Sequence, residues 1–504
     1  MVRDAGRGVE MMQRSMARDG ALRQALAALH AGRFAEARDL AAGWRVDPAG
    51  GALHALGLAG AGDVAGGGAA LDAAARANPA ARHPVFDLVE LLRAQRREGE
   101  APAHVAAALA HQPGRAALLG LLGATLAETG PTGAAIGAFA EAARVAPGGA
   151  AAWSNLGKAL AAAGRFDEAE GAFGRAALLA PGEAQVRLNH GVARLKAGRW
   201  AEGWPLFRAR HDLPGHAGGL AGAELRDLRG VAGKTVLLVH DEGFGDTLQF
   251  IRYAPLLAGL GARVVVWAPP PLVRLLRGME GIAEVAECGG HRTPRGGGVA
   301  YDAWCRVADL PGVFGTTVET IPGALPYLAA DPGLVAAWSG RLPSGCRVGL
   351  VWAGAGRPHD PGAAATDRQR SLRADMLGPL LGIAGIDWVS LQQGLAPPGG
   401  VFDPMPGVAD FADTAAIIEG LELVVSVDTA VAHLVAAMGR RVILLDRYDS
   451  CWRWLHGRAD SPWYPGRVSI LRQQAPGDWG GVLRRVAGHP WVAALAGGSG
   501  LARP

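Results

Sequence analysis

Prolines recur at a nearly constant spacing between Pro48 and Pro181 of this 504-residue chain. The prolines that could end helices are Pro48, Pro79, Pro113, Pro147 and Pro181, and the last three intervals between them are identical. Ala-Gly or Thr-Gly pairs give a second marker, since they start at positions 61, 129, 163 and 197. The last two intervals between these pairs equal the proline interval, and the first is twice as long. Two independent markers in one register indicate a tandem repeat.

A unit of about 34 residues, the interval seen here, is the length of the tetratricopeptide repeat, which consists of two helices. Residues 153–181 resemble that repeat most clearly. The matching residues are Trp153, Leu156, Gly157, Ala163, Gly164, Phe166, Ala169, Phe173, Ala176 and Pro181. Small residues let the paired helices approach, large ones fill the space between them, and the proline stops the second helix. We expect an all-α tetratricopeptide solenoid over residues 20–210.

Two details of the array lead to separate predictions. Gly66, Gly67 and Gly68 fall where a second helix begins, and each glycine costs a helix ~1 kcal/mol relative to alanine, so we expect looser order there. Trp200, Trp204 and Phe207 are spaced like the apolar face of a closing helix, which favours a place in the core. Such arrays bind protein partners or serve in structure and self-association, and the sequence leaves these roles open.

The second half changes to short, nearly unbroken apolar runs separated by helical segments, after a loop at about 211–232. The clearest runs are residues 236–240, 264–268, 348–354, 423–428 and 442–446. Strands buried on both faces of a parallel sheet need such runs. We expect two Rossmann-like α/β domains, at 233–330 and 345–480, followed by a helix and tail at 481–504. Ligands of such sheets bind beyond the carboxyl ends of the strands.

The loop after the first run contains Gly243, Gly245 and Asp246, and it leads into a helix that carries Gln249. Leu248 occupies the place of the third glycine of a dinucleotide fingerprint, which disfavours NAD. The turn brings backbone N–H groups and one carboxylate to the edge of the sheet. A structural interpretation is also open, because Asp246 followed by Gln249 has the spacing of a helix-capping box.

Residues 426–433 take a buried strand directly into a helix. A helix start offers free N–H groups and a partial positive charge, which suits a phosphate. Thr429 and His433 are four positions apart and share one face of the first turn, while Asp428 is alternatively an ordinary cap. Residues 232–235 resemble the end of a P-loop, but they precede their strand and lack its first glycine, so we reject that interpretation.

A third loop follows Trp352 and Gly354 and is predicted to be long and polar, with His359, Asp360, Asp367 and Arg368 in it. Arg370 is the last residue of this loop, and a helix is expected to start at the next residue, Ser371. Because an arginine keeps its proton and binds phosphate oxygens in pairs, Arg370 is a candidate for holding a diphosphate. A solvated loop arginine would look the same in the sequence.

Composition excludes some classes of function. Lys+Arg 50 against Asp+Glu 46 gives a net charge of only +4, which disfavours a dedicated nucleic-acid binder. The cysteines, Cys288, Cys305, Cys346 and Cys451, are far apart, and no D-x-D pair or His/Cys cluster occurs, so neither a metal nor another cofactor is expected. No signal peptide or run of ~20 apolar residues is present, which predicts a soluble cytoplasmic protein.

Together the three loops give residues 235–473 a resemblance to bacterial tetratricopeptide-repeat glycosyltransferases of GT-B fold, related to the O-GlcNAc transferase and ADP-heptose heptosyltransferase families. The residues that carry it are 243–246, 350–354, 370–372, 428–433 and 461–465. One departure is Ala355, where similar proteins usually have an asparagine.

The resemblance implies a metal-independent, inverting transfer of a sugar from a nucleotide-diphosphate sugar to a protein or glycan hydroxyl. Its implied catalytic residues are Asp246 as base, with Arg370 and His433 at the leaving group. The donor-side residues would be Trp352, Gly354, Arg370, Ser371, Asp428, Thr429, Ala430 and His433, and the acceptor-side residues Gly243, Gly245, Asp246 and Gln249. A non-enzymatic interaction scaffold with a degenerate GT-B part remains the alternative.

Overall fold

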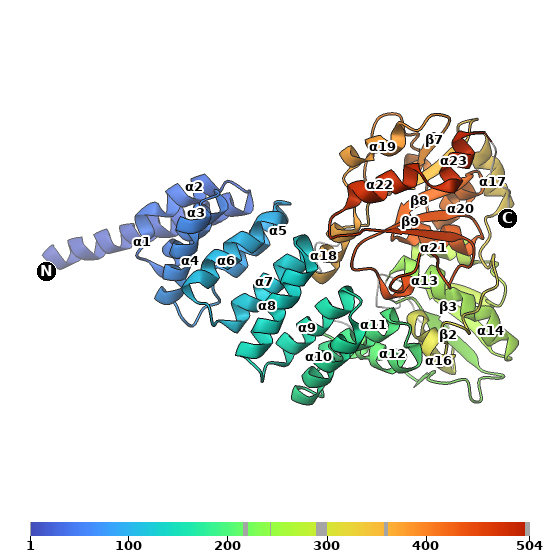
Figure 1. The fold of residues 1–504 in the computed structure, drawn as a ribbon, viewed down its shortest axis with the longest axis horizontal. Helices are drawn as coiled ribbons and strands as arrows, with labels where there is room; N and C mark the ends of the chain where they lie inside the picture. Colours follow the sequence, from blue (N-terminus) through green and yellow to red (C-terminus); the bar gives the residue numbers. More distant parts are fainter. Residues whose placement is uncertain (1, 215–219, 242, 289–299, 357–360, 499–504) are drawn as a thin grey trace. The chain divides into compact units, whose positions relative to one another are not determined.

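The computed structural model describes residues 2–214, 220–241, 243–288, 300–356 and 361–498 (Figure 1). The chain divides into two compact units. The first comprises Met1–Leu160 and Glu168–Ala180, and the second comprises Ala161–Asp167 and Pro181–Pro504.

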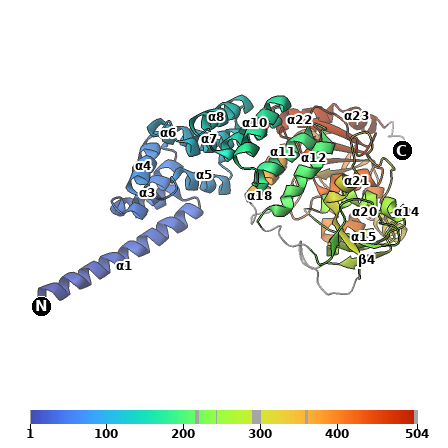
Figure 2. The same ribbon diagram turned by 90° about the horizontal axis from the view of Figure 1, so that it is seen from below.

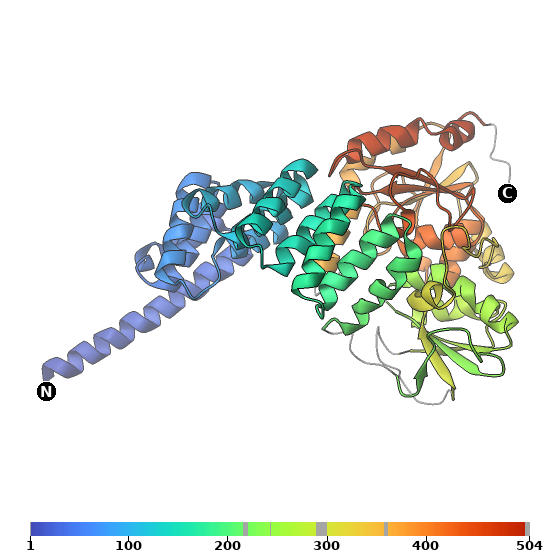
Figure 3. The same cartoon turned by 60° about the horizontal axis from the view of Figure 1, so that its bottom comes forward.

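The first unit is a helical repeat region that resembles tetratricopeptide repeats (Figure 3). Its helices are α1 (Val2–His30), α2 (Phe34–Ala41), α3 (Pro48–Gly60), α4 (Val64–Ala77), α5 (Val85–Ala94), α6 (Ala101–His111), α7 (Ala116–Thr129), α8 (Thr132–Val145), α9 (Ala150–Ala162) and α10 (Phe166–Leu179). Four of the predicted prolines, at 79, 113, 147 and 181, stand just after the ends of α4, α6, α8 and α10. Pro48 differs, since it is the first residue of α3 rather than a helix stop.

A repeated contact explains the period of the array. A Cβ at Gly123 would lie 2.7 Å from the ring of Phe139, and one at Gly157 would lie 2.9 Å from the ring of Phe173. In each case a glycine of the first helix of a pair makes room for a phenylalanine of the second. The two glycines are as far apart in the sequence as the two phenylalanines, and as far apart as Pro113 and Pro147, which confirms the predicted register.

The predicted loosening at Gly66, Gly67 and Gly68 is wrong for the described helix, because all three lie inside α4. A Cβ at Gly67 would lie 2.5 Å from the Cα of Ala59, and one at Gly68 would lie 2.8 Å from the Cβ of Ala107. The glycines therefore allow α4 to approach its neighbours α3 and α6 closely. This close packing offsets their low helix propensity.

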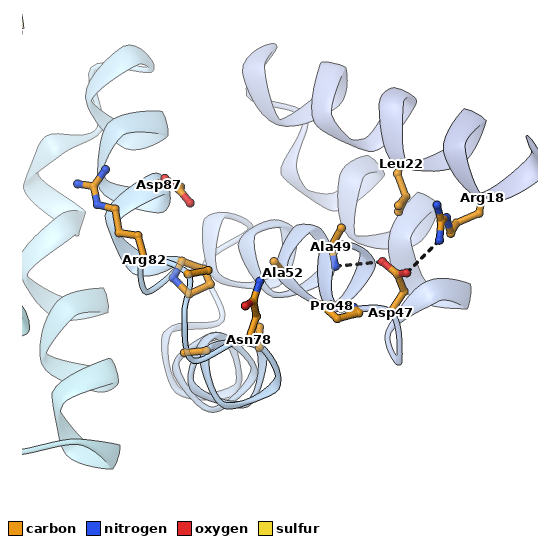
Figure 4. Close-up of a pocket in the computed structure, with 13 residues that line it drawn as sticks. Arg18, Leu22, Asp47, Pro48, Ala49, Ala52, Asn78, Arg82 and Asp87 are labelled. Carbon is orange, nitrogen blue, oxygen red and sulfur yellow. Dashed lines mark hydrogen bonds and ion pairs between the residues drawn. The ribbon is translucent and has the colours of Figure 1, made fainter. Parts of the chain in front are cut away.

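A hollow of about 430 Å³ lies on the first unit, beside α1, α3 and α4 (Figure 4). Arg18 and Asp47 form an ion pair of 3.3 Å at one side of it. Asn78, Arg82 and Asp87 are at the other side. Alanines make up much of the remaining lining, so the hollow is lined by small apolar side chains together with polar groups.

The second unit begins with α11 (Ala184–Lys196) and α12 (Trp200–Phe207). Trp200, Trp204 and Phe207 are buried, which confirms that this aromatic stripe is core. Trp200 stacks on Trp463 with ring centroids 5.1 Å apart, and Trp204 meets Trp452 edge-on at 5.3 Å. The last helix pair therefore shares a core with the chain that follows it.

The first sheet of this unit is parallel and has the strand order β1-β5-β2-β3-β4. Its strands are β1 (Ala223–Glu224), β2 (Thr235–Val239), β3 (Arg263–Ala268), β4 (Glu284–Glu287) and β5 (Ala303–Arg306). The strand β1 lies within the segment that the sequence predicts to be a loop. Helices α13 (Phe244–Phe250), α14 (Ala254–Gly259), α15 (Pro270–Leu276) and α16 (Leu310–Val313) accompany the sheet.

The second sheet is also parallel, with the order β10-β9-β8-β6-β7. Its strands are β6 (Arg347–Val351), β7 (Asp387–Ser390), β8 (Leu423–Val427), β9 (Val442–Asp446) and β10 (Val468–Arg472). The helices, several of them labelled in Figure 2, are α17 (Pro332–Ser339), α18 (Pro361–Arg370), α19 (Gly378–Leu381), α20 (Phe411–Glu419), α21 (Ala430–Ala437), α22 (Trp479–Ala487) and α23 (Pro490–Ala496).

The predicted fold class, a helical repeat region followed by two parallel-sheet α/β domains, is confirmed. Each of the five apolar runs forms a strand, β2, β3, β6, β8 and β9. None of the helices in the described residues is long and apolar enough to cross a membrane.

Candidate functional site

The glycine-rich loop after β2 forms the start of α13. Gly243 is the residue that caps this helix, and its N–H donates to Oδ2 of Asp246 at 3.0 Å. Asp246 therefore does stabilise the helix start, but from the third helical position rather than as the cap itself. Gln249 plays no part in a capping box, because it is fully buried and its amide has no hydrogen-bond partner among the residues described.

The loop of the first sheet lies directly against a helix of the second. A Cβ at Gly245 would lie 3.0 Å from Cδ2 of His433 and 3.5 Å from the Cα of Ala430. Both residues are in the first turn of α21, and Figure 1 shows α13 beside α21. The loops after β2 and β8, which the sequence singled out separately, therefore meet at one place.

Thr429 is the residue at which α21 begins. Its backbone is extended, and in the described part of the chain no side chain caps the helix. The interpretation of Asp428 as an ordinary cap is therefore wrong; the Thr429 hydroxyl itself lies 3.2 Å from that of Ser426. Asp428, Thr429 and Ala430 are half-buried, and the first-turn N–H groups of α21 are left for another acceptor.

His433 lies beneath this turn and not on its surface. Its Nδ1 is 2.9 Å from the hydroxyl of Tyr464, and its ring stacks on Trp454 with centroids 5.0 Å apart. Burial lowers the pKa of His433 to about 4, even though Asp428 opposes the shift. His433 is therefore neutral at neutral pH and adds no positive charge to the site.

Arg370 reaches the same helix start from α18. Its Nη1 donates to the backbone carbonyl of Asp428 at 2.7 Å, and its Nη2 pairs with Asp367. The predicted long polar loop is wrong for residues 361–370, which form α18, and no helix starts at Ser371, since the helical turn that follows begins at Ala374. His359 and Asp360 lie outside the described residues.

Gly354, which follows β6, lies against the side chain of Arg370. A Cβ at Gly354 would lie 2.5 Å from the Nε of Arg370, so only glycine leaves room for this guanidinium. The Gly354 N–H donates to the Ser371 hydroxyl at 3.0 Å, and Trp352 is buried. Gln392, which the sequence did not single out, accepts from the Trp352 and Ala353 N–H groups.

Two arginines were missed by the sequence analysis. Arg453, in the segment after β9, pairs with Oδ1 of Asp246, which comes from the other sheet. Arg252 is buried, donates to the Trp463 carbonyl at 2.7 Å, and lies over the ring of Tyr464 at 4.7 Å. These contacts join the two α/β domains around α21, and no local pattern in the sequence marks them.

One group of described residues has the spacing of metal ligands. His211, Glu224 and Asp309 offer ligand atoms within 4.8 Å of one another. Arg208 pairs with Glu224 at 2.7 Å, and Arg210 pairs with Asp309 at 2.8 Å, so guanidinium groups already neutralise both carboxylates. We interpret this group as an ion-pair network around the buried Asp309 and not as a metal centre.

Fold and site together define a helical repeat protein with two parallel-sheet α/β domains that meet at the start of α21. Residues 406–454 match the sequence model of glycosyltransferase family 9 (heptosyltransferase). This segment contains β8, α21, β9 and Arg453, and the match supports glycosyltransferase activity in general.

The chain is also similar to Protein FlbA of Caulobacter vibrioides, with 27% identity over 291 residues. The aligned region covers 52% of this chain and 46% of FlbA, so the chain spans about half the length of the curated relative it matches.

Solved structures resemble the two halves separately. The glycosyl transferase family 9 protein from Veillonella parvula is 9% identical, with a TM-score of 0.33 over 48% of this chain and 87% of that one. The TPR protein YrrB is 20% identical, with a TM-score of 0.25 over 34% and 89%, and MamA is 20% identical, with a TM-score of 0.24 over 31% and 91%. Scores this low carry no weight for function.

Proposed function

We propose that the protein transfers a sugar from a nucleotide-diphosphate sugar to an acceptor hydroxyl, by an inverting mechanism that uses no metal. The observation that carries this proposal is the contact of Gly245 with Ala430 and His433. It supports the proposal because the loop that carries Asp246 lies against a helix start that no described side chain caps. The proposed base and the proposed anion site would then lie on neighbouring loops.

The donor diphosphate would bind at the first turn of α21, where N–H groups and the helix dipole favour negative charge. Arg370 already donates to the carbonyl of Asp428, the residue before the cap, so its guanidinium is within reach of a phosphate there. These groups would stabilise the charge that grows on the leaving diphosphate. The guanidinium group and the backbone N–H groups would thus stabilise the leaving diphosphate, as a bound metal ion does in other enzymes.

The proposed reaction has one base. The acceptor oxygen forms a bond to the anomeric carbon while the bond from that carbon to the diphosphate oxygen breaks. The acceptor proton goes to Asp246, and the bonding electron pair leaves with the nucleoside diphosphate. Attack from the side opposite the leaving group inverts the configuration of the sugar. His433, neutral and buried, would support α21 rather than exchange a proton.

Calorimetry tests the donor site. UDP, GDP, ADP, dTDP and their sugar conjugates would be titrated into the full chain. At least one diphosphate should bind, and Arg370→Ala should weaken it about ten- to a hundredfold, since a hydrogen bond to a charged group contributes about 1.5–3 kcal/mol. Arg368→Ala, on the same helix, is the matched control and should bind normally. Absence of binding to the whole panel would favour the scaffold alternative.

We further propose that the hollow of the helical array holds part of a protein acceptor. Its alanine lining suits an extended main chain, and Asn78, Arg82 and Asp87 offer polar contacts. Ala52→Trp would fill the hollow, which Ala52 lines. Transfer to macromolecules in a lysate should then fall, while binding of the diphosphate stays unchanged. If the unaltered chain and the Ala52→Trp variant transferred sugar to macromolecules equally, the hollow would not hold the acceptor.

A further inference from the structure

Arg453 occupies a place that the proposed reaction does not yet explain. It belongs to the segment after β9 of the second sheet, but its Nη2 pairs with Oδ1 of Asp246 at the start of α13, which follows the first sheet. The other oxygen of Asp246 accepts the Gly243 N–H at 3.0 Å. Each oxygen of the proposed base is therefore already engaged.

The residues next to Arg453 and next to its partner Asp246 contact the first turn of α21, the proposed donor site. The Arg453 guanidinium lies 4.5 Å from the ring centroid of Trp452, and the next residue, Trp454, stacks on His433 in the first turn of α21. Its partner Asp246 follows Gly245, which contacts Ala430 in the same turn. Arg453 thus borders both the proposed base and the proposed anion site.

Charge around this helix start favours a change of partner. Arg370 pairs with Asp367 and Arg453 pairs with Asp246, so two carboxylates neutralise the two guanidinium groups. Asp428 adds a third carboxylate, 3.9 Å from the Nε2 of a neutral His433. A diphosphate that binds here therefore competes with Asp367 and Asp246 for these two guanidinium groups, because opposite charges at such distances attract strongly.

We infer that Arg453 is a second phosphate-binding residue that exchanges partners. Without donor it pairs with Asp246; with donor bound, its guanidinium moves to the diphosphate and releases Oδ1 of Asp246 to accept the proton of the acceptor. The exchange would couple base activation to occupancy of the donor site. This inference rests on the proposed function and assigns a residue that the sequence analysis did not name.

Carboxyl footprinting of the unaltered chain tests the exchange. The protein would be treated with a carbodiimide and glycine ethyl ester, which modify accessible carboxyl groups. The treatment would be done with and without the nucleoside diphosphate that calorimetry shows to bind. Mass spectrometry would then measure the modification of Asp246. We expect binding to raise the modification of Asp246 at least twofold. Asp460, exposed and paired with Arg458, is the internal control and should not change. Unchanged or lower modification of Asp246 overturns the inference.

Variants give an independent test. Asp246→Asn removes the carboxylate that competes with the diphosphate for Arg453, whereas Asp246→Asn combined with Arg453→Gln also removes the charge of the arginine. We expect the double variant to bind the diphosphate about tenfold more weakly than the single variant. Equal dissociation constants would mean that Arg453 does not reach the phosphate.

The two proposals fail in different ways. If no nucleoside diphosphate binds the unaltered chain, the proposed function fails and takes this inference with it. If a diphosphate binds but neither the footprint of Asp246 nor the pair of variants responds as expected, the donor site stands and only the exchange is excluded.

Discussion

Gly245 touches His433 across the boundary between the two α/β domains: a Cβ at position 245 would lie 3.0 Å from Cδ2 of the imidazole. The imidazole cannot move away easily, because Tyr464 and Trp454 hold it from the other side. The closeness of the two loops thus depends on the absence of a side chain at position 245.

Gly245→Val should therefore disturb both stability and the donor site. Overpacking of a well-packed contact costs about 1–3 kcal/mol, so we expect a lower melting temperature and weaker binding of the diphosphate. Thermal unfolding and calorimetry would measure the two effects. Gly259→Val in α14 is the matched control, since nothing lies within 4 Å of a Cβ there. If both variants behave alike, the contact at Gly245 has no special role.

Asp246 has a helix-stabilising contact as well as its proposed role as base, and one substitution separates the two. Asp246→Asn keeps an oxygen for the Gly243 N–H but removes the basic carboxylate. A general base contributes about 10²–10⁴ to the rate, so we expect Asp246→Asn to lower kcat more than Arg370→Ala, which removes a charged hydrogen bond worth about 1.5–3 kcal/mol. Full turnover together with a lower melting temperature would show that Asp246 serves only the helix.

His433 should make stability depend on pH. Its pKa is about 4 when folded and about 6.5 when unfolded, so between these values the unfolded chain binds a proton that the folded protein does not. Stability from this residue is complete above pH 6.5 and is lost as the pH falls toward 4, by about 3 kcal/mol.

Melting temperatures of the unaltered chain and of His433→Asn between pH 4 and 8 would check this. The difference between the two proteins should shrink as the pH falls. Tyr464→Phe, which keeps the imidazole but removes its hydrogen-bond partner, should retain the pH dependence. A difference that is constant with pH would contradict the neutral, buried state of His433.

The helical array offers a test of its repeated glycine. Gly157→Val would drive a side chain into the ring of Phe173, where a Cβ alone already lies at 2.9 Å, and we expect a loss of about 1–3 kcal/mol. Gly171→Val on α10, with nothing within 4 Å, is the control and should lose little. Circular dichroism during thermal unfolding would compare them. Equal melting temperatures would mean that the repeated glycine–phenylalanine contact is not a determinant of stability.

The sequence predicted the parts of the fold that leave a periodic or continuous apolar trace. The helix pairs appeared through their prolines, and β2, β3, β6, β8 and β9 appeared as unbroken apolar runs. Two of the strands that it missed are short or polar. β4, at the edge of its sheet, has the sequence Glu-Val-Ala-Glu with both ends exposed, and β1 has only two residues. An edge strand has fewer neighbours to bury it and so needs no apolar run.

The sequence likewise marked some residues of the candidate site and not others. The loops around Asp246 and Thr429 could be found because a glycine turn and a helix start mark them locally, whereas Arg370 lies at the end of α18 and not in the predicted loop. The pairing of Arg453 with Asp246 joins residues 207 positions apart, and nothing near either one records it. His433 was predicted to face the ligand, but burial against Trp454 and Tyr464 depends on the packing of the segment after β9, which one helical turn cannot reveal.

The most direct measurement of the central claim is a crystal structure of the full chain with the nucleoside diphosphate that calorimetry selects. We predict that its phosphates lie within about 3 Å of the backbone N–H groups of residues 430–432 and of the Arg370 guanidinium, opposite Asp246. A diphosphate bound anywhere else, with the first turn of α21 empty, would contradict the account.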